Sequence, residues 1–174
     1  MTDLDLARWR RRLIVTQTCA VWAGAVGRDG YGRFSYRYGG AERTVTPHQV
    51  AAWLAARDGG PGLTAGSTVL HDCEVRLCCT TGAGHVRVAT QAENMRQAAQ
   101  RGRAVGPRPG RVDIRGPLGL SRAIQTGLRA HRDRSPAGLA RALAGIVAAG
   151  DPGRSQLGLF SLSTADATAA AART

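Results

Sequence analysis

The sequence contains no lysine, so its 24 basic residues are all arginines, which outnumber 12 acidic residues and give a formal net charge of +12. It also lacks an apolar run long enough to span a membrane, and residues 1–15 lack the apolar core of a signal peptide. These absences argue against a membrane partner. The remaining partner for this charge is a polyanion such as double-stranded DNA, whose phosphates and guanine edges fit the planar fork of arginine. We therefore expect a cytoplasmic protein that binds DNA.

In the reducing cytoplasm, the four cysteines are expected to bind zinc rather than to form disulfides. Cys73 and Cys78 are followed by His85, and thiolates and imidazole are the ligands that zinc prefers. A tetrahedral structural Zn²⁺ site needs a fourth ligand, for which Cys19 is the obvious donor. The metal would hold the glycine-rich loop before His85, which has almost no apolar side chain to bury. Cys79 is then a packing residue, although the spacing leaves open that Cys78 and Cys79 exchange roles.

Two further residues, His71 before the zinc ligands and Asn94 after them, have the chemistry of a phosphodiester hydrolase. Such hydrolysis requires an activated water, a cation that neutralises the developing charge, and in-line placement of the reacting groups. An imidazole that titrates near neutrality suits proton abstraction, so His71 is the candidate general base. The amide oxygen of Asn94 can hold a catalytic Mg²⁺. The alternatives are a histidine that merely lies beside the zinc and an ordinary amide on a helix surface.

These candidates fall on a predicted strand, loop, strand and helix. Residues 68–70 and 85–88 have the character of short strands, and the capping box Thr90-x-x-Glu93 starts a helix that ends near residue 101. Asn94 then lies in the first helical turn, where its amide can face His71. Arginines continue along and beyond this helix at Arg96, Arg101 and Arg103. They form either a solvated face or a set of phosphate contacts.

The segment from Cys19 to Thr46 contains two turn signals, at residues 28–30 and 38–40, which separate three runs with strand character. We therefore predict a three-stranded antiparallel sheet. Side chains of its middle run alternate between two faces, with Phe34 and Tyr36 packing inward. The opposite face, expected to contact the major groove of DNA, carries Tyr31, Arg33, Ser35 and Arg37. The alternative is an exposed, arginine-rich face without a ligand.

The stretch from Cys19 to Arg103 resembles the HNH, or ββα-metal, endonucleases of phages and mobile introns, and the His-Cys box homing endonucleases share its ligand spacing. The resemblance rests on the order and spacing of short motifs along this stretch, among them Cys19-Ala20-Val21-Trp22, Gly30-Tyr31-Gly32-Arg33, His48-Gln49-Val50, His71-Asp72-Cys73, Ala92-Glu93-Asn94-Met95 and Arg101-Gly102-Arg103. It implies an α+β fold with a zinc-stapled ββα-metal nuclease motif, and DNA cleavage of the homing or phage type with one catalytic divalent metal. It also implies that Arg33 reaches the cleaved phosphate. Ala83-Gly84 departs from the Asn-Pro step that the family often has before its second histidine.

We expect a nuclease domain with a DNA-binding sheet over residues 1–104, a linker and helical appendage over residues 105–150, and a flexible tail over residues 151–174. Thr46-Pro47 starts a helix that ends near residue 57, in which His48 is expected to have a packing role. The two helices of the appendage, predicted at 117–130 and 136–149, can pack on the nuclease domain, form a hairpin or mediate a homodimer.

A motif in the tail resembles the peptide by which bacterial replication and repair proteins bind the β sliding clamp; its residues are Gln156, Leu157, Leu159 and Phe160. The alternative is a tail that docks apolar residues on its own domain. For the whole protein, the alternatives to an endonuclease are a zinc-dependent DNA-binding module that does not cleave and a clamp-recruitment factor. His71 together with Asn94 favours the endonuclease, because a binding module requires neither.

Overall fold

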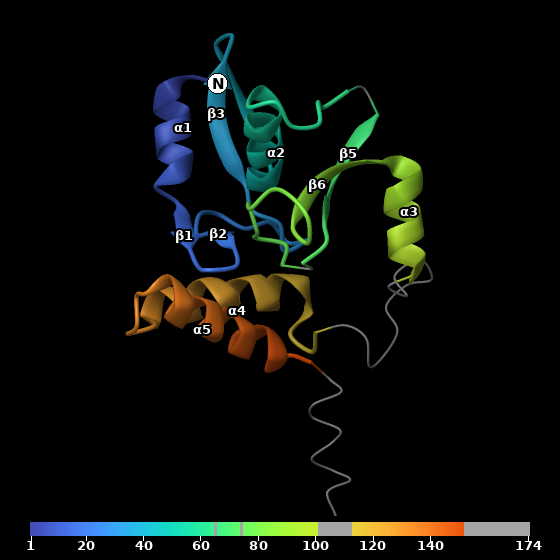
Figure 1. Cartoon of the computed structure of the whole chain (residues 1–174). Coiled ribbons are helices and arrows are strands. Elements are labelled where there is room, and N and C mark those ends of the chain that lie inside the picture. Colours follow the sequence, from blue (N-terminus) through green and yellow to red (C-terminus); the bar gives the residue numbers. More distant parts are fainter. Residues whose placement is uncertain (65, 74, 101–112, 152–174) are drawn as a thin grey trace, which may run out of the picture.

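The computed structural model describes residues 1–64, 66–73, 75–100 and 113–151. Within these ranges the fold is mixed, with five helices and three two-stranded antiparallel sheets (Figure 1). The helices are α1 (Asp3–Arg10), α2 (Pro47–Arg57), α3 (Gln91–Gln100), α4 (Gly116–Ala130) and α5 (Pro136–Ala148). The strands are β1 (Leu13–Val15), β2 (Ala20–Trp22), β3 (Phe34–Tyr38), β4 (Ala41–Val45), β5 (Ser67–His71) and β6 (Val86–Thr90). Arg101, Arg103 and the proposed clamp motif lie outside the described residues.

Helix α1 is absent from the predictions above, although the sequence holds its start signal. Thr2 and Asp5 form a capping box, in which Thr2 N–H donates to Asp5 Oδ2 (3.0 Å) and Asp5 N–H donates to Thr2 Oγ1 (3.2 Å). Only Leu6 and Trp9 of this helix are buried, which leaves a weak apolar pattern. The Arg8 guanidinium lies 5.1 Å from the centre of the Phe34 ring and joins α1 to β3.

The predicted three-stranded sheet is wrong, because its strands pair with other partners. β2 pairs with β1, whose apolar run was not assigned to a strand above, and β3 pairs with β4. Between β2 and β3 the chain passes close to the buried Trp22 indole. A Cβ at Gly32 would lie only 2.5 Å from Cδ1 of that ring, so glycine is needed there. A loop packed around Trp22 therefore replaces the predicted ladder between β2 and β3.

The hairpin of β3 and β4 is confirmed at its predicted turn. Gly39 and Gly40 have φ values of 59° and 78°, the positive values that a tight two-residue hairpin turn requires. Within β3 the predicted alternation also holds, since Phe34 is buried while Ser35 and Arg37 are exposed. Helix α2 begins directly after Thr46 and ends at Arg57, as predicted, and lies beside this hairpin (Figure 1).

The predicted strand, loop, strand and helix around the candidate metal ligands are confirmed as β5, β6 and α3. β5 pairs antiparallel with β6 over the whole of both strands, from the Ser67–Thr90 pair to the His71–Val86 pair. The capping box forms as expected: Thr90 N–H donates to Glu93 Oε2 (2.7 Å), and Glu93 N–H donates to Thr90 Oγ1 (3.2 Å). This unit places His71 at the end of β5, where the loop between β5 and β6 begins.

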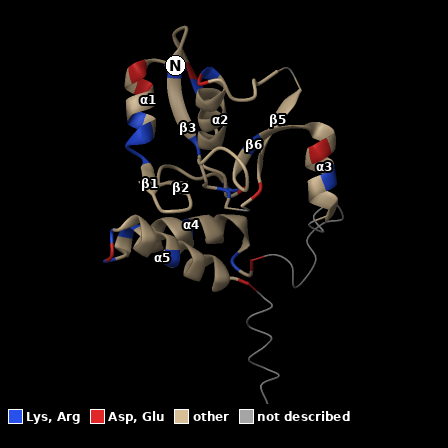
Figure 2. Ribbon diagram, in the orientation of Figure 1, with Lys and Arg blue, Asp and Glu red and all other residues tan. Residues whose placement is uncertain are grey.

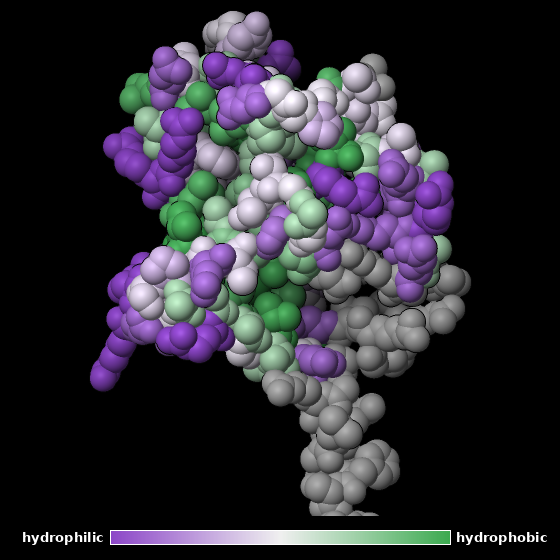
Figure 3. All heavy atoms as spheres, in the orientation of Figure 1, coloured by the Kyte–Doolittle hydropathy of each residue, from purple (hydrophilic) through white to green (hydrophobic). Residues whose placement is uncertain are grey.

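Helices α4 and α5 pack on each other and on the preceding part of the chain, where they form a layer (Figure 1). Ile124, Leu128, Leu139 and Leu143 belong to the same buried core as Trp22 and Phe34. Apolar side chains gather where this layer meets the rest of the molecule (Figure 3). None of the helices in the described ranges has both the length and the apolar character needed to cross a bilayer.

Replacing Gln125 with alanine should lower the free energy of unfolding by about 1–3 kcal/mol. The side chain is buried, and its Nε2 donates to the carbonyls of Trp22 (3.1 Å) and Gly24 (2.7 Å), which would lose this donor. Thr126→Ala, at the next and exposed position, should change the free energy by less than about 0.5 kcal/mol. Urea unfolding compares the two variants. Equal stabilities would mean that α4 does not unfold together with the core.

Candidate metal centre and active site

Cys19 and the loop between β5 and β6 are far apart in the sequence but adjacent in the fold. Residues 77–79 of that loop run antiparallel to β2: a β-bridge joins Val21 to Cys78, and backbone hydrogen bonds of 2.7 and 2.8 Å lie on either side of it. Cys19, the residue before β2, is thereby brought beside Cys78. The strand pairing, rather than any local pattern, completes the set of ligands.

The four residues predicted to bind zinc form a cluster. Their ligand atoms all lie within 4.8 Å of one another, and the cluster consists of Cys19, Cys73, Cys78 and His85. The Sγ atoms of Cys19 and Cys78 each lie 3.6 Å from Nδ1 of His85. A tetrahedron with Zn–S bonds of about 2.3 Å and Zn–N bonds of about 2.0–2.1 Å separates sulfur from nitrogen by about 3.6 Å. The cluster therefore fits a metal ion such as zinc.

The structure also answers which of the two adjacent cysteines belongs to the cluster. Cys78 contributes its sulfur, whereas Cys79 is buried elsewhere and its thiol donates to the carbonyl of Leu77 at 3.7 Å. Burial, followed by the neighbouring Cys78, raises the pKa of Cys79 well above its ordinary value. Cys79 therefore stays a protonated packing residue.

Proton sharing within the cluster explains why a cation would stabilise it. Hydrogen bonds from Cys19, then Cys78, lower the pKa of Cys73, while hydrogen bonds with Cys73, then Cys78, raise the pKa of Cys19. One thiolate is thus stabilised by two neighbouring thiols. All three sulfurs can be thiolates at neutral pH only if a positive ion compensates their charge.

Three rings meet at the end of β5, next to the metal cluster. The ring of His48 meets that of His71 edge-on, with 4.4 Å between their centres, and the Tyr31 ring lies 5.4 Å from His48 and 5.9 Å from His71. His48 is buried, as expected of a packing residue, and its Nε2 lies 3.2 Å from Thr46 Oγ1. Burial, then the charges of His71 and Arg33, lower the pKa of His48 to about 3, so its imidazole is neutral at physiological pH.

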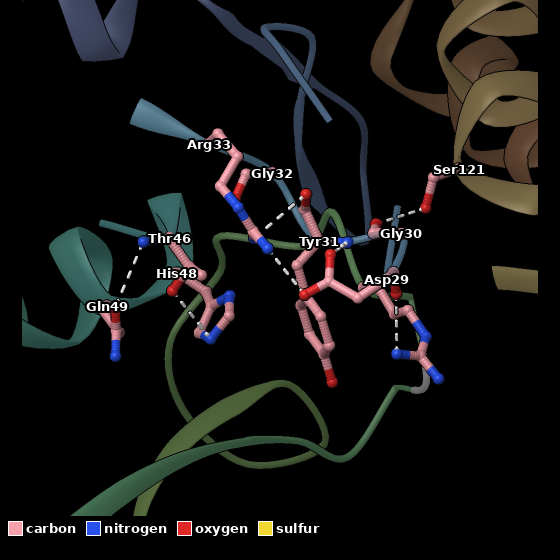
Figure 4. A network of polar contacts seen from close by, with 10 residues as sticks. Asp29, Gly30, Tyr31, Gly32, Arg33, Thr46, His48, Gln49 and Ser121 are labelled. Carbon is pink, nitrogen blue, oxygen red and sulfur yellow. Dashed lines mark hydrogen bonds and ion pairs between the residues drawn. The ribbon is translucent and has the colours of Figure 1, made fainter. Parts of the chain in front are cut away.

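Two guanidinium groups border these rings. Arg33 donates to the Asp29 carboxylate at 2.7 Å (Figure 4), and Arg76 donates to the Asp29 carbonyl at 3.0 Å. The Arg76 guanidinium also lies 4.9 Å from the centre of the Tyr31 ring. Ser121 of α4 donates to the carbonyl of Gly30 at 2.6 Å and so fixes the same segment (Figure 4). The chemistry gathered here is two imidazoles, a phenol and two arginines.

Asn94 is partly buried in the first turn of α3, where its Nδ2 donates to Gln91 Oε1 at 3.4 Å. Asp72, the residue after His71, joins α3 to the end of β5, because it accepts hydrogen bonds from Gln97 Nε2 of α3 (2.6 Å) and Arg87 Nε of β6 (3.0 Å). Asn94 precedes Gln97 by almost one helical turn, so both residues lie on one side of α3.

The residues expected on one DNA-binding face divide into two groups. Ser35 and Arg37 are exposed on β3, where Ser35 Oγ lies 2.9 Å from Thr44 Oγ1 and Arg37 lies directly opposite Glu42 of β4. Tyr31 and Arg33 precede β3 and belong to the ring cluster instead. Arg96 is exposed on α3. Further exposed arginines lie at the C-terminal end of α1, next to β1, where Figure 2 shows a stretch of positive charge.

Sequence reasoning missed Arg76 beside the ring of Tyr31 and assigned His48 a packing role alone. Neither residue has a neighbour in the sequence that would indicate its partners. Comparison with protein families, with curated proteins and with solved structures finds no match.

Proposed function

We propose that the protein is a zinc-stabilised DNA endonuclease of the HNH type, which hydrolyses phosphodiester bonds with His71 as general base. The observation that carries this proposal is the cluster at the end of β5 formed by His71, His48, Tyr31, Arg33 and Arg76. It is bordered by α3 and by the Cys/His cluster, whose spacing fits a metal ion. A module that only binds DNA would have no need of two imidazoles in contact beside a binding site.

The arginines support a phosphate group as the substrate. A guanidinium presents several donors in one plane, which match the oxygens of a phosphate and leave donors available while a carboxylate or carbonyl is also bound. Arg33 can therefore keep its hydrogen bond to Asp29 and still contact a phosphate oxygen. Arg76 approaches the same segment from the zinc loop. Together they would compensate the charge that develops during hydrolysis.

The surroundings of His71 support its role as the base. The imidazole of His71 is among the groups that lower the pKa of Cys73, after Cys19 and Cys78. When one ring nitrogen donates to this sulfur, the other is the proton acceptor of the imidazole. The neutral His48 ring, edge-on at 4.4 Å, limits rotation of the His71 ring without adding a charge. His71 would take the proton of the attacking water.

Two metals have different roles in this proposal. Zinc on Cys19, Cys73, Cys78 and His85 would hold the loop that carries Arg76 and fixes His71. Asn94 would hold Mg²⁺ through its amide oxygen, and this ion would supply positive charge for the phosphate and the leaving oxygen. The hydrogen bond from Gln97 to Asp72 supports the Asn94 role by keeping α3 against the end of β5.

Supercoiled plasmid provides the direct test. Purified protein with Mg²⁺ should convert it to relaxed or linear DNA, and omitting Mg²⁺ while zinc stays bound should prevent this. A zinc-loaded, folded protein that binds the plasmid without cleaving it under any divalent cation would contradict the nuclease proposal and favour a binding module.

Replacing Arg37 with alanine should weaken DNA binding several-fold and lower the salt dependence by about one counterion. Its guanidinium is exposed on the outer face of β3, where a phosphate can approach. Arg141→Ala, on α5, removes the same charge from an exposed side chain that is paired with Asp133 (3.1 Å), and should change affinity less. Fluorescence anisotropy with a labelled duplex across a salt series, without Mg²⁺, compares them. Equal losses would show that net charge, not the sheet, determines binding.

A further inference from the structure

A groove between the β3–β4 hairpin and α2 lies outside the site described above. It has a volume of about 290 Å³, and its walls include Tyr36, Tyr38, Val50 and Trp53. Tyr38 and Trp53 are 66% and 36% exposed, respectively, which is unusual for such large rings. The groove is therefore an accessible aromatic surface rather than part of the closed core.

The rim of this groove is basic. The Arg57 guanidinium lies 5.0 Å from the centre of the Trp53 ring. Arg43 is the cross-strand partner of Tyr36, so both side chains lie on the same face of the hairpin. Neither arginine forms an ion pair with an acidic residue in the described ranges. Aromatic rings flanked by unneutralised arginines match the chemistry of a nucleic acid base with its phosphates, and do not match a purely apolar peptide.

Gln49 adds a polar group to the groove wall. Its Oε1 accepts a hydrogen bond from Thr46 N–H at 3.2 Å (Figure 4), which fixes the amide and leaves its Nε2 amino group to donate. The preceding residue, His48, contacts His71. Since a helix rises about 1.5 Å per residue, Trp53 and His48 are separated by only about 7.5 Å along α2. The groove therefore lies about one and a half turns along α2 from the proposed site of cleavage, on a different side of the helix.

We propose that this groove binds an unpaired nucleobase of the DNA strand, stacked on Trp53 and Tyr38, with its flanking phosphates on Arg43 and Arg57. The inference rests on the proposed nuclease function for the identity of the polymer. Base stacking of this kind is tolerant of sequence, so the groove would position a strand without selecting its bases.

Tryptophan fluorescence isolates this site, because Trp9 and Trp22 are 5% and 0% exposed while Trp53 is accessible. Titrating the full chain with a short oligothymidylate in Mg²⁺-free buffer should quench Trp53. Trp53→Ala and Tyr38→Ala should each lower affinity, measured by anisotropy, roughly 5- to 100-fold. Trp53→Phe should keep most of the affinity and lose the quenching. Val147→Ala, an exposed apolar residue on α5, is the matched control and should leave affinity unchanged.

A set of oligonucleotides, each with one abasic position, gives the decisive comparison. At one position, the abasic site should lower the affinity of the wild type about as much as Trp53→Ala lowers the affinity for the intact oligonucleotide. The same abasic site should not lower the affinity of the Trp53→Ala variant any further. Additive losses at every position, or affinity unaffected by Trp53→Ala, would overturn the proposal. A further control replaces Leu159 and Phe160 in the absence of DNA. If this replacement changes the fluorescence of Trp53, the chain's own tail occupies the groove, and the proposal is overturned. These measurements involve no cleavage, so an absence of nuclease activity cannot imitate their failure.

Discussion

Purified protein should contain about one zinc ion per chain, and removing that ion should unfold the part of the molecule around the β5–β6 loop. The ligand spacing supports this stoichiometry, since two sulfurs lie 3.6 Å from Nδ1 of His85 and all four ligand atoms lie within 4.8 Å. Structural zinc contributes about 10–16 kcal/mol in small zinc domains, which is as much as the whole stability of an ordinary domain of about 5–15 kcal/mol.

The first part of the loop pairs with β2 at residues 77–79, but its last part has little besides the metal to hold it. Residues 81–84 are threonine, glycine and alanine, and Gly82 and Gly84 take positive φ values of 114° and 77°. All four of these residues are exposed, although Val86 just beyond them is buried. Loss of the metal would leave three thiols and an imidazole close together. Hydrogen bonds among the thiols would then favour the thiolate form of only one of them.

Cys73→Ser should therefore lose zinc and lower the melting temperature strongly, whereas Cys79→Ser should keep the metal. Cys79 is the matched control, because it is a neighbouring buried thiol outside the cluster. Elemental analysis and circular dichroism with and without a strong chelator measure both properties. A folded, reduced preparation without any bound metal would contradict the assignment, as would equal zinc loss in the two variants.

Local sequence signals predicted the elements of this fold better than their pairing. The capping box at Thr90 and the Thr46-Pro47 start gave the limits of α3 and α2 closely, because a cap depends only on residues within one turn. The sheet was wrong because strand pairing depends on distant residues: β2 could pair with several neighbours, and the bulk of Trp22 beside Gly32 favours the arrangement found.

The candidate site shows the same division. The members of the cluster were predictable, since thiols and imidazole at short spacing have a specific chemistry and Cys19 was the obvious fourth donor. The convergence of His48 and Arg76 on Tyr31 was not predictable, because these three residues come from separate elements. Tyr31 and Arg33 were placed on a strand face by simple alternation, yet the chain has not entered β3 at these positions.

Replacing His71 with alanine should reduce plasmid cleavage by a factor of about 10²–10⁴, the usual contribution of a general base. The side chain lies at the end of β5, 4.4 Å from His48 between ring centres, and next to a metal cluster that does not include it. Zinc content and DNA affinity should therefore remain close to those of the wild type. Cys73→Ser, in contrast, should lose zinc, folding and cleavage together.

Asn94→Ala should produce a comparable loss by a different route, because its amide is proposed to hold Mg²⁺ rather than to move a proton. The two defects are separable. Added imidazole should restore part of the activity of His71→Ala but none of Asn94→Ala, while raising the Mg²⁺ concentration should help only Asn94→Ala. Gln91→Ala, which removes the neighbouring group that Asn94 Nδ2 contacts at 3.4 Å, is a matched control on the same helix and should cleave almost normally. Wild-type rates in either His71→Ala or Asn94→Ala, with zinc bound and Mg²⁺ matched, would mean that the reaction centre lies elsewhere in the molecule.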